Sequence, residues 1–183
     1  MKRLAVILAA LVLSVAASAQ SHFGFLGGLS FSNAPKVAEL DLRTATLYHA
    51  GLTYQYKFTQ GFSVQPSVLL MMKGANNQDK SSAIREGSIE IPVSFQWGPD
   101  LLLFRPYVEV VPYVGFNIPK LGTPIVDPAI VNGGVGVGGG IEIWKLQISA
   151  RYNWNLNPHR KVAAGEEPTW AYRCTTLSLA FLF

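Results

Sequence analysis

Residues 146–156, LQISARYNWNL, alternate between apolar and polar side chains along their whole length. Leu146, Ile148 and every second residue after them are apolar, whereas the residues between them are polar, with Arg151 at the centre. A β-strand directs successive side chains to opposite faces, so this stretch predicts a strand with two unlike faces. The rest of the sequence has to decide whether the apolar face lies against protein or against lipid.

Seven further stretches show the same period of two, and no stretch has a convincing long helical period. They are FGFLGGLSF (23–31), YHAGLTYQYKF (48–58), FSVQPSVLLMMK (62–73), SIEIPVSFQW (88–97), a fifth strand from about Leu102 to Phe116, VGVGGGIEIW (135–144) and TTLSLAFLF (175–183). With residues 146–156 they make eight predicted strands. The sequence therefore predicts an all-β chain.

The connections between these strands differ in length. Three are tight turns, at residues 59–61, at 98–100 and at Lys145, and their turn residues are typical of hairpins. The other four are long, at about 33–46, 74–87, 117–130 and 157–171. Short and long connections alternate, so every tight turn falls at one end of the sheet. Outer-membrane barrels have this asymmetry, with short periplasmic turns and long external loops.

Aromatic residues gather at the ends of the predicted strands, which is where membrane interfaces favour them. The predicted belt comprises Tyr56, Phe58, Phe62, Phe95, Trp97, Trp144, Phe181 and Phe183 beside the turns or the C-terminus, and Trp154 near a long connection. A strand of about 11 residues, tilted by ~40°, rises roughly 28 Å, enough to cross an apolar band about 25 Å tall. Aromatics are also good strand formers, but that preference does not explain their position at strand ends.

The composition also indicates that the outer face lies in lipid. Only 14% of the residues are charged and 49% are hydrophobic, whereas about 25% charged is usual for soluble domains. In lipid every backbone polar group must be paired internally, so a membrane sheet has to close. We therefore predict a closed antiparallel eight-stranded up-and-down transmembrane β-barrel, with its apolar face toward lipid and the Arg151 face inward.

The first residues resemble an export signal. Lys2 and Arg3 precede an apolar run, 4–13, which is too short to span a bilayer as a helix, and Ala17-Ser18-Ala19 forms a cleavage site. We expect a signal peptide over 1–19 and a barrel domain over 20–183, located in the outer membrane. Cleavage lowers the formal charge from +4 to +2, which is too mild to indicate nucleic-acid binding.

Several segments together resemble the PorT-like outer-membrane β-barrel family of Gram-negative bacteria: GLTYQYKFTQGFSVQPSVLLMMKGA, IEIPVSFQW, PYVEVVPYVGF, ISARYNWNL and the final Phe183. Their order along the chain is a stronger signal than any one of them. The resemblance implies a small antiparallel barrel, and a C-terminal aromatic that resembles the signal read by the barrel-insertion machinery. The family includes proteins linked to secretion, and the resemblance transfers no catalytic motif.

An eight-stranded barrel is just wide enough for its own side chains, so inward charges have to meet inside it. The predicted inward charges are Lys57, Glu90, Arg105, Glu109, Glu142 and Arg151. We expect an ion-pair network, centred on Arg151 with Glu109 and Glu90, that plugs the lumen. The alternative is a set of separate, solvated lumen charges.

The glycine run 133–140 contains a formal G-x-G-x-x-G, but strand alternation continues after it, whereas a dinucleotide site needs a helix there. We expect these inward glycines to make room for bulky neighbours such as Arg151 or Tyr113. His22, His49 and His159 have no metal-ligand spacing, and no cofactor is predicted. Four prolines lie inside predicted strands, and we expect the register to fail in the fifth strand: Pro66, Pro92, Pro106 and Pro112.

The residues leave several functions open. The first is a non-enzymatic closed scaffold whose long loops bind an envelope or secretion partner, and the second is a narrow channel. A rim enzyme would use His49 with Ser81 and Ser82, and a soluble lipocalin-like carrier would reverse the two faces of each strand. Mixed charges in the long loops could also touch lipopolysaccharide phosphates.

Overall fold

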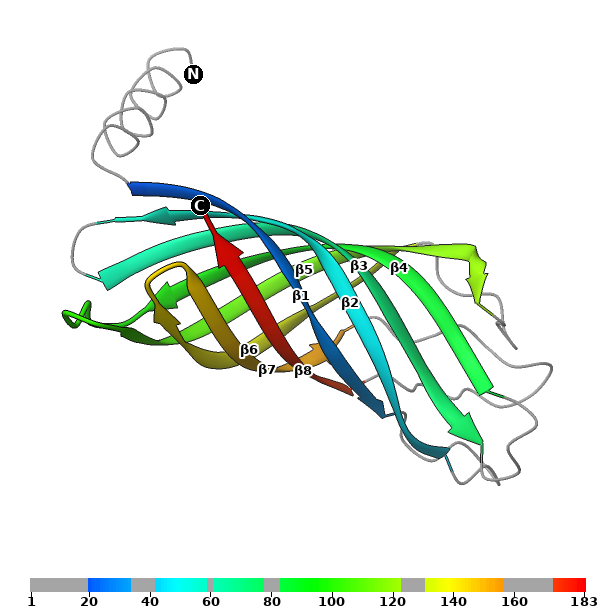
Figure 1. Ribbon diagram of the computed structural model, residues 1–183. Helices are drawn as coiled ribbons and strands as arrows, with labels where there is room; N and C mark the ends of the chain where they lie inside the picture. Colours follow the sequence, from blue (N-terminus) through cyan, green and yellow to red (C-terminus); the bar gives the residue numbers. More distant parts are fainter. Residues whose placement is uncertain (1–19, 34–41, 59–60, 78–82, 123–130, 157–172) are drawn as a thin grey trace, which may run out of the picture.

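The computed structural model describes residues 20–33, 42–58, 61–77, 83–122, 131–156 and 173–183. The predicted signal peptide, 1–19, lies outside these residues. Eight strands make up the fold (Figure 1): β1 (Gln20–Asn33), β2 (Leu42–Lys57), β3 (Phe62–Asn77), β4 (Ala83–Trp97), β5 (Arg105–Gly122), β6 (Val131–Ile143), β7 (Leu146–Asn155) and β8 (Arg173–Leu182). Among the described residues no helix is both long enough and apolar enough to cross a membrane.

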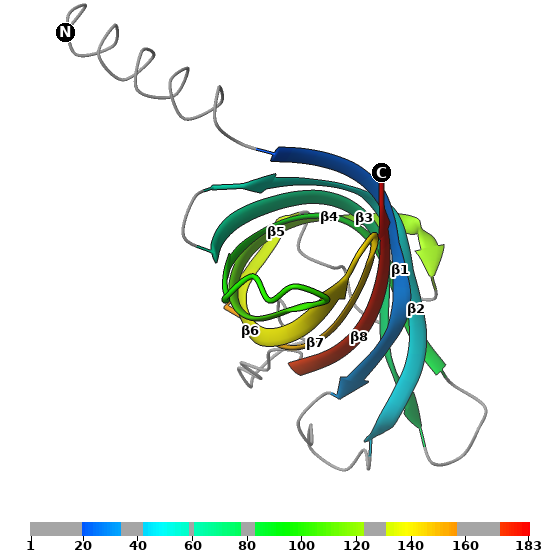
Figure 2. The ribbon, with the colours of Figure 1, turned by 60° about the vertical axis from the view of Figure 1, so that its left-hand side comes forward.

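The sheet closes on itself. Each strand pairs antiparallel with the next, and β8 returns to pair with β1, which confirms the predicted closed eight-stranded barrel (Figure 2). At the closure Phe23 and Phe183 exchange two backbone hydrogen bonds, of 3.2 and 2.7 Å. Closure leaves neither edge strand unpaired, which is the condition for a sheet in lipid.

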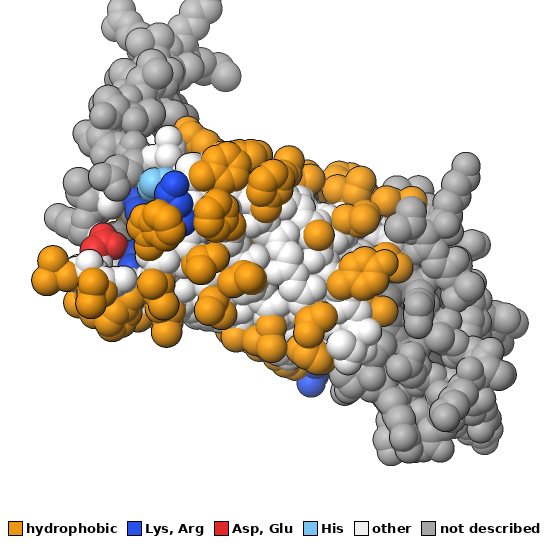
Figure 3. Space-filling model, viewed as in Figure 1, with side chains coloured by type: hydrophobic (Ala, Val, Ile, Leu, Met, Phe, Trp, Pro, Cys, Tyr) orange, Lys and Arg blue, Asp and Glu red, His pale blue; other side chains and the backbone are white. Residues whose placement is uncertain are grey.

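The outer face of the barrel is apolar and its inner face is polar. Ile148, Leu179 and Val110 face outward and are about half exposed, at 57%, 52% and 50%, whereas Gln147, between two outward residues, is 3% exposed. Figure 3 shows apolar side chains spread over the visible wall, with the charged ones near its ends. This facing is the opposite of the one that a soluble carrier requires, and it is the one that lipid requires.

We call the end of the barrel with the connections 58–61, 98–104 and 144–145 the turn end, and the opposite end the loop end. The fifth strand begins at Arg105 rather than near Leu102, and it continues to Gly122. Leu102 and Leu103 instead project from the turn end, 105% and 82% exposed. The strands β2 to β5 have 15 to 18 residues and β6 to β8 have 10 to 13, so the wall is taller on one side.

The contrast between short and long connections is therefore weaker than the sequence predicts. Strands β3 and β4 extend to Asn77 and from Ala83, and so they take up most of the predicted loop 74–87. The connection 98–104 at the turn end is longer than 78–82 at the loop end. The sequence predicted a long loop here because residues 74–87 do not alternate between apolar and polar side chains. Strands that continue beyond the membrane can pair without such alternation.

The register of the fifth strand does not fail at its two prolines. Pro106 pairs with Ile141 and Pro112 with Val135, within one unbroken register between β5 and β6. The register shifts instead toward the loop end, between Thr44 and His49 in β2 and between Ile118 and Gly122 in β5. In the second case the β4 partners, Gly87 and Glu86, are consecutive, so three extra residues lie on β5. A proline removes one donor, and a strand can lose one bond to one neighbour without shifting its register.

Candidate functional site

The lumen near the turn end holds three of the predicted charges. Glu142 of β6 forms ion pairs with Lys57 of β2 and with Arg105 of β5, the latter at 3.4 Å. Arg105 also donates to the Gly61 carbonyl and to Ser63 Oγ, both at 2.9 Å. Asp100, in the connection before β5, lies 3.5 Å from Arg105 Nε. One buried arginine thus joins β5 to the end of the turn between β2 and β3.

Above this group lies a layer of four buried glutamines, Gln55, Gln65, Gln96 and Gln147, which we call the amide layer. Gln96 Nε2 donates to Gln65 Oε1 at 2.7 Å, and Gln65 Nε2 donates to Gln147 Oε1 at 3.0 Å. Gln55 Nε2 donates to Glu142 Oε2 at 3.1 Å, which joins the layer to the charges below. A side-chain amide suits such a layer because it has both donor and acceptor atoms.

A second ion pair lies farther toward the loop end. Arg151 Nε and Nη2 donate to the two carboxylate oxygens of Glu109, at 3.0 and 3.2 Å, in a bidentate pair. The Glu109 side chain is fully buried and that of Arg151 is 12% exposed, while Ser94 Oγ also donates to Glu109. The predicted charges therefore form two groups, separated by the amide layer.

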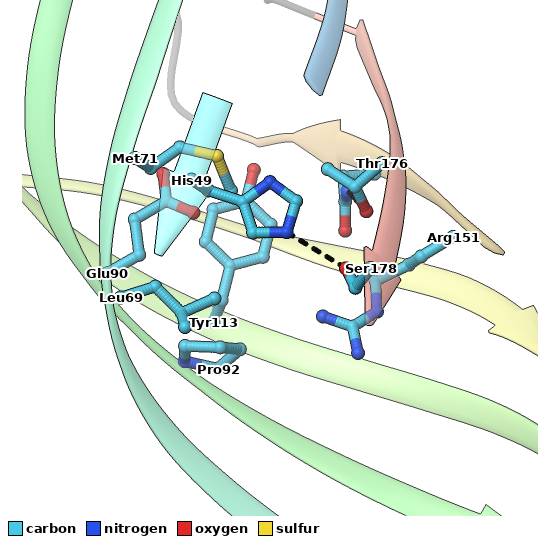
Figure 4. Close-up of a pocket in the computed structure, with 10 residues that line it drawn as sticks. His49, Leu69, Met71, Glu90, Pro92, Tyr113, Arg151, Thr176 and Ser178 are labelled. Carbon is cyan, nitrogen blue, oxygen red and sulfur yellow. Dashed lines mark hydrogen bonds between the residues drawn. The ribbon is translucent and has the colours of Figure 1, made fainter. Parts of the chain in front are cut away.

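A small cavity adjoins Arg151 on its loop-end side (Figure 4). Its lining includes the predicted network residue Glu90, together with His49, Tyr113 and Arg151. Ser88 Oγ also donates to Glu90, at 3.4 Å. The cavity volume available to the centre of a water molecule is about 10 Å³, room for about one water.

His49 lies inside the lumen rather than at an exposed rim. It is 2% exposed, and its Nδ1 and Nε2 lie 2.9 Å from Ser30 Oγ and from Ser178 Oγ. Both ring nitrogens are thus used within the protein. Ser81 and Ser82, its expected partners in a rim enzyme, lie outside the described residues. Among the residues that are described, no group of three or more His, Cys, Asp or Glu could hold a metal ion.

The glycines of β6 leave space for the bulky lumen side chains. A Cβ at Gly140 would lie 2.5 Å from Tyr107 Oη, and one at Gly134 would lie 2.5 Å from Tyr113 Oη. At Gly136 a Cβ would meet the Arg151 side chain at 3.0 Å. Two tyrosines and one arginine thus pack against β6 at positions where any larger residue would displace them.

The predicted belt residues lie on the outer wall. At the turn end these side chains are about half exposed or more, and Trp154 at the loop end is less exposed: Phe62 52%, Phe95 51%, Trp97 53%, Trp144 79%, Phe181 44%, Phe183 51% and Trp154 37%. Tyr56 and Phe58 are partly exposed beside them. Phe62 pairs with Trp97 across β3 and β4, and Phe23 contacts Phe183 across the closure, so the turn-end aromatics touch around the wall.

Sequence reasoning missed the glutamines, the serines and Asp100 as members of the plug. The signal was present, because each glutamine occupies an inward position of its alternating strand. The predicted network contained only charged residues, so these uncharged polar side chains were left out of it. Which inward residues touch across the lumen is set by the register, and alternation does not give the register.

Several solved structures are similar to this chain. Neisserial surface protein A is similar over 90% of this chain and 99% of its own, at 13% identity and a TM-score of 0.54. The N-terminal β-barrel domain of Pseudomonas aeruginosa OprF is 11% identical over 90% of this chain and 100% of its own, with a TM-score of 0.44. Ail of Yersinia pestis, solved with the heparin analogue sucrose octasulfate, is 12% identical over 90% of this chain and 99% of its own, with a TM-score of 0.43.

No curated protein sequence matches the chain significantly. Residues 5–169 match the family of the outer membrane protein beta-barrel domain, and so the match covers most of the chain. The lipid-facing apolar wall and the closed sheet are what such a domain requires. The chain therefore belongs to the outer membrane protein beta-barrel domain family and is an outer-membrane protein.

Proposed function

We propose that the protein is a non-enzymatic, closed barrel of the PorT-like type, which presents its long loop-end connections to an envelope or secretion partner. In this proposal the chain is exported with a cleaved signal peptide over 1–19. Its C-terminal Phe183 is the residue that the barrel-insertion machinery recognises. Outer-membrane lipid and lipopolysaccharide surround the wall.

One observation carries the proposal: side chains from opposite strands touch across the lumen. In a ring of eight strands β3 lies opposite β7, and β2 lies opposite β6. Gln65 and Gln147 join the first pair at 3.0 Å, and Gln55 and Glu142 join the second at 3.1 Å. Direct contacts between opposite walls support a lumen that is closed to hydrated ions at the amide layer.

The lumen chemistry supports a structural role over a catalytic one. Glu109 and Arg151 use their charges on each other, and both nitrogens of His49 are hydrogen bonded to serines. A catalytic base needs a substrate within hydrogen-bond reach, and the adjoining cavity has room for about one water. We therefore expect the function of this protein to depend on a partner that binds its loops.

Conductance in a planar bilayer tests the closed lumen. The folded protein, identified by its heat-sensitive mobility on a gel, is expected to give no steady openings. The double variant Gln65→Ala/Gln147→Ala removes one contact between opposite walls, so openings are expected to appear or increase. As a matched control, Ser149→Ala changes an inward side chain of β7 that lies outside the amide layer. Steady openings of the unmodified protein would make it a narrow channel and overturn the proposal.

A loop exchange tests the partner. Residues 157–172 are replaced by a short turn, and the variant is compared with the unmodified protein by crosslinking in intact cells. We expect the barrel to fold and a specific envelope crosslink to disappear. If the set of crosslinked proteins is unchanged when each of the four loop-end connections is shortened in turn, the binding role of the loops is wrong.

A further inference from the structure

Three prolines interrupt the pairing of three neighbouring strand pairs. Between β2 and β3 the pairing stops after Thr53↔Ser67 and resumes at Tyr56↔Val64, on either side of Pro66. Between β3 and β4 it is interrupted beside Pro92, and between β4 and β5 beside Pro112. The register is the same on both sides of each interruption, so the gaps are missing bonds and not slips.

The three prolines lie on one line across the wall. Pro66 pairs with Val93, the residue that follows Pro92. Pro92 in turn pairs with Tyr113, the residue that follows Pro112. Proline has no N–H to donate, so successive bonds are missing along this line. We call Pro66, Pro92 and Pro112 the proline row.

The other half of the barrel has no such gap. The pairings β5–β6, β6–β7, β7–β8, β8–β1 and β1–β2 are continuous over all their described positions. Pro106, near the turn end of β5, does not interrupt its pairing with β6. Interrupted pairing is thus confined to the sector from β2 to β5, and at the level of the prolines it crosses all three strand pairs of this sector.

The proline row lies within the lipid-facing part of the wall. Val68 and Val110, on the strands that carry the row, are 52% and 50% exposed on the outer face. From the inner side Thr53 Oγ1 donates to the Pro66 carbonyl at 3.4 Å. In lipid no water replaces a missing backbone bond, so the strands on either side of the row are held less firmly than their neighbours.

Behind the row lies the cavity beside Arg151, and Pro92 belongs to both (Figure 4). Leu69, Met71 and Pro92 form an apolar side of this cavity, whereas polar side chains form the rest. The cavity is therefore amphipathic. It lies directly inside the weakest sector of the wall.

We propose that the wall opens along the proline row, and that this opening widens the cavity, which has room for about one water while the wall is closed, and admits small amphiphiles dissolved in the bilayer. Such a ligand has an apolar body, for the side with Leu69 and Met71, and one hydrogen-bonding end for the polar side. The barrel stays closed to ions along its axis because the amide layer is not part of the opening. The access route is sideways, from lipid to lumen.

Thiol labelling in liposomes tests this route. In a Cys174→Ala background, Ser67→Cys places a thiol at the row and Ser149→Cys places one in β7, where the pairing is continuous. The two serines are matched, because both face the lumen and both are 7% exposed. The probe is N-phenylmaleimide, which partitions into lipid and has an apolar ring with a polar end.

We expect position 67 to react faster than position 149. Adding Pro92→Ala to the Ser67→Cys variant restores a donor between β3 and β4, and it is expected to slow the reaction about fivefold, the effect of one backbone hydrogen bond on an opening equilibrium. Equal rates at the two positions, or an unchanged rate after Pro92→Ala, would overturn the proposal. The proposal would also be overturned if a charged, water-soluble maleimide reacted at position 67 faster than N-phenylmaleimide does, since the charged reagent arrives through the lumen mouth.

Hydrogen exchange of the unmodified protein in nanodiscs gives a test without substitutions. Backbone amides of residues 67–69 and 93–95, beside the row, are expected to exchange faster than those of residues 148–150 in β7. If all of them exchange at the same slow rate, the wall does not open at the row.

Discussion

The bidentate pair between Arg151 and Glu109 offers the sharpest energetic prediction. Replacing Arg151 by Met removes two charge-assisted hydrogen bonds, of 3.0 and 3.2 Å, and leaves a fully buried carboxylate without its cation. Hydrogen bonds to charged groups contribute about 1.5–3 kcal/mol each, and breaking a buried pair from one side costs about 3–5 kcal/mol. We therefore expect the free energy of unfolding to fall by about 3–5 kcal/mol.

The double variant Arg151→Met/Glu109→Gln separates charge from packing. A glutamine at 109 carries no charge and its amide oxygen still accepts from Ser94, so the cost of an unpaired buried carboxylate is absent. We expect it to recover most of the lost stability. Lys145→Met is the matched control, because it removes a positive charge at a turn, where Lys145 lies 5.3 Å from the Trp144 ring centre. Its expected cost is about 1 kcal/mol or less.

Urea unfolding in lipid vesicles, followed by tryptophan fluorescence in both directions, measures these differences. Heat-sensitive mobility on a gel confirms that each variant starts from the folded barrel. The reasoning is refuted if Arg151→Met costs no more than Lys145→Met. It is also refuted if the double variant is as unstable as Arg151→Met alone.

Two further predictions concern the wall. Gly140→Ala is expected to lower the unfolding free energy by about 1–3 kcal/mol, because its Cβ would lie 2.3 Å from a backbone oxygen and 2.5 Å from Tyr107 Oη. Gly27→Ala is its control, since that Cβ finds only ordinary contacts, and equal effects in the two variants would contradict the packing argument. Val110→Lys places a charge on the lipid face and is expected to cost about 2–4 kcal/mol in the same unfolding assay. Leu102→Lys, beyond the turn end of β5, is expected to change stability little, and a similar loss in both would mean that the wall at Val110 does not face hydrocarbon.

Strand alternation predicted which residues face inward, because a period of two follows from the geometry of the strand itself. It also placed Arg151 and Glu109 in the lumen and the glycines of β6 opposite large side chains. It also placed Glu142 and Arg105 nearer the turn end than Arg151, and in the structure Arg151 pairs with Gly138 of β6, four residues before Glu142. It did not predict the amide layer that separates the two groups of charges.

The proline row is a second feature that the separate strands could not reveal. Each of Pro66, Pro92 and Pro112 is a local anomaly in its own strand, and from the sequence we therefore expected only a failing register in the fifth strand. Only the pairing of Pro66 with Val93 and of Pro92 with Tyr113 places them on one line. The turn before Arg105 was misjudged for a simpler reason, since an apolar run in a projecting connection looks like the start of a strand.

The central claim is that the apolar face of each strand meets lipid and the polar face fills a closed lumen. Spin labels placed singly along β7, at each residue from 147 to 155, test it most directly in liposomes. Oxygen collides preferentially with labels in lipid, so the account predicts collision rates that alternate with a period of two and are high at Ile148 and Ala150. The opposite phase, with high rates at Gln147 and Ser149, would contradict the account.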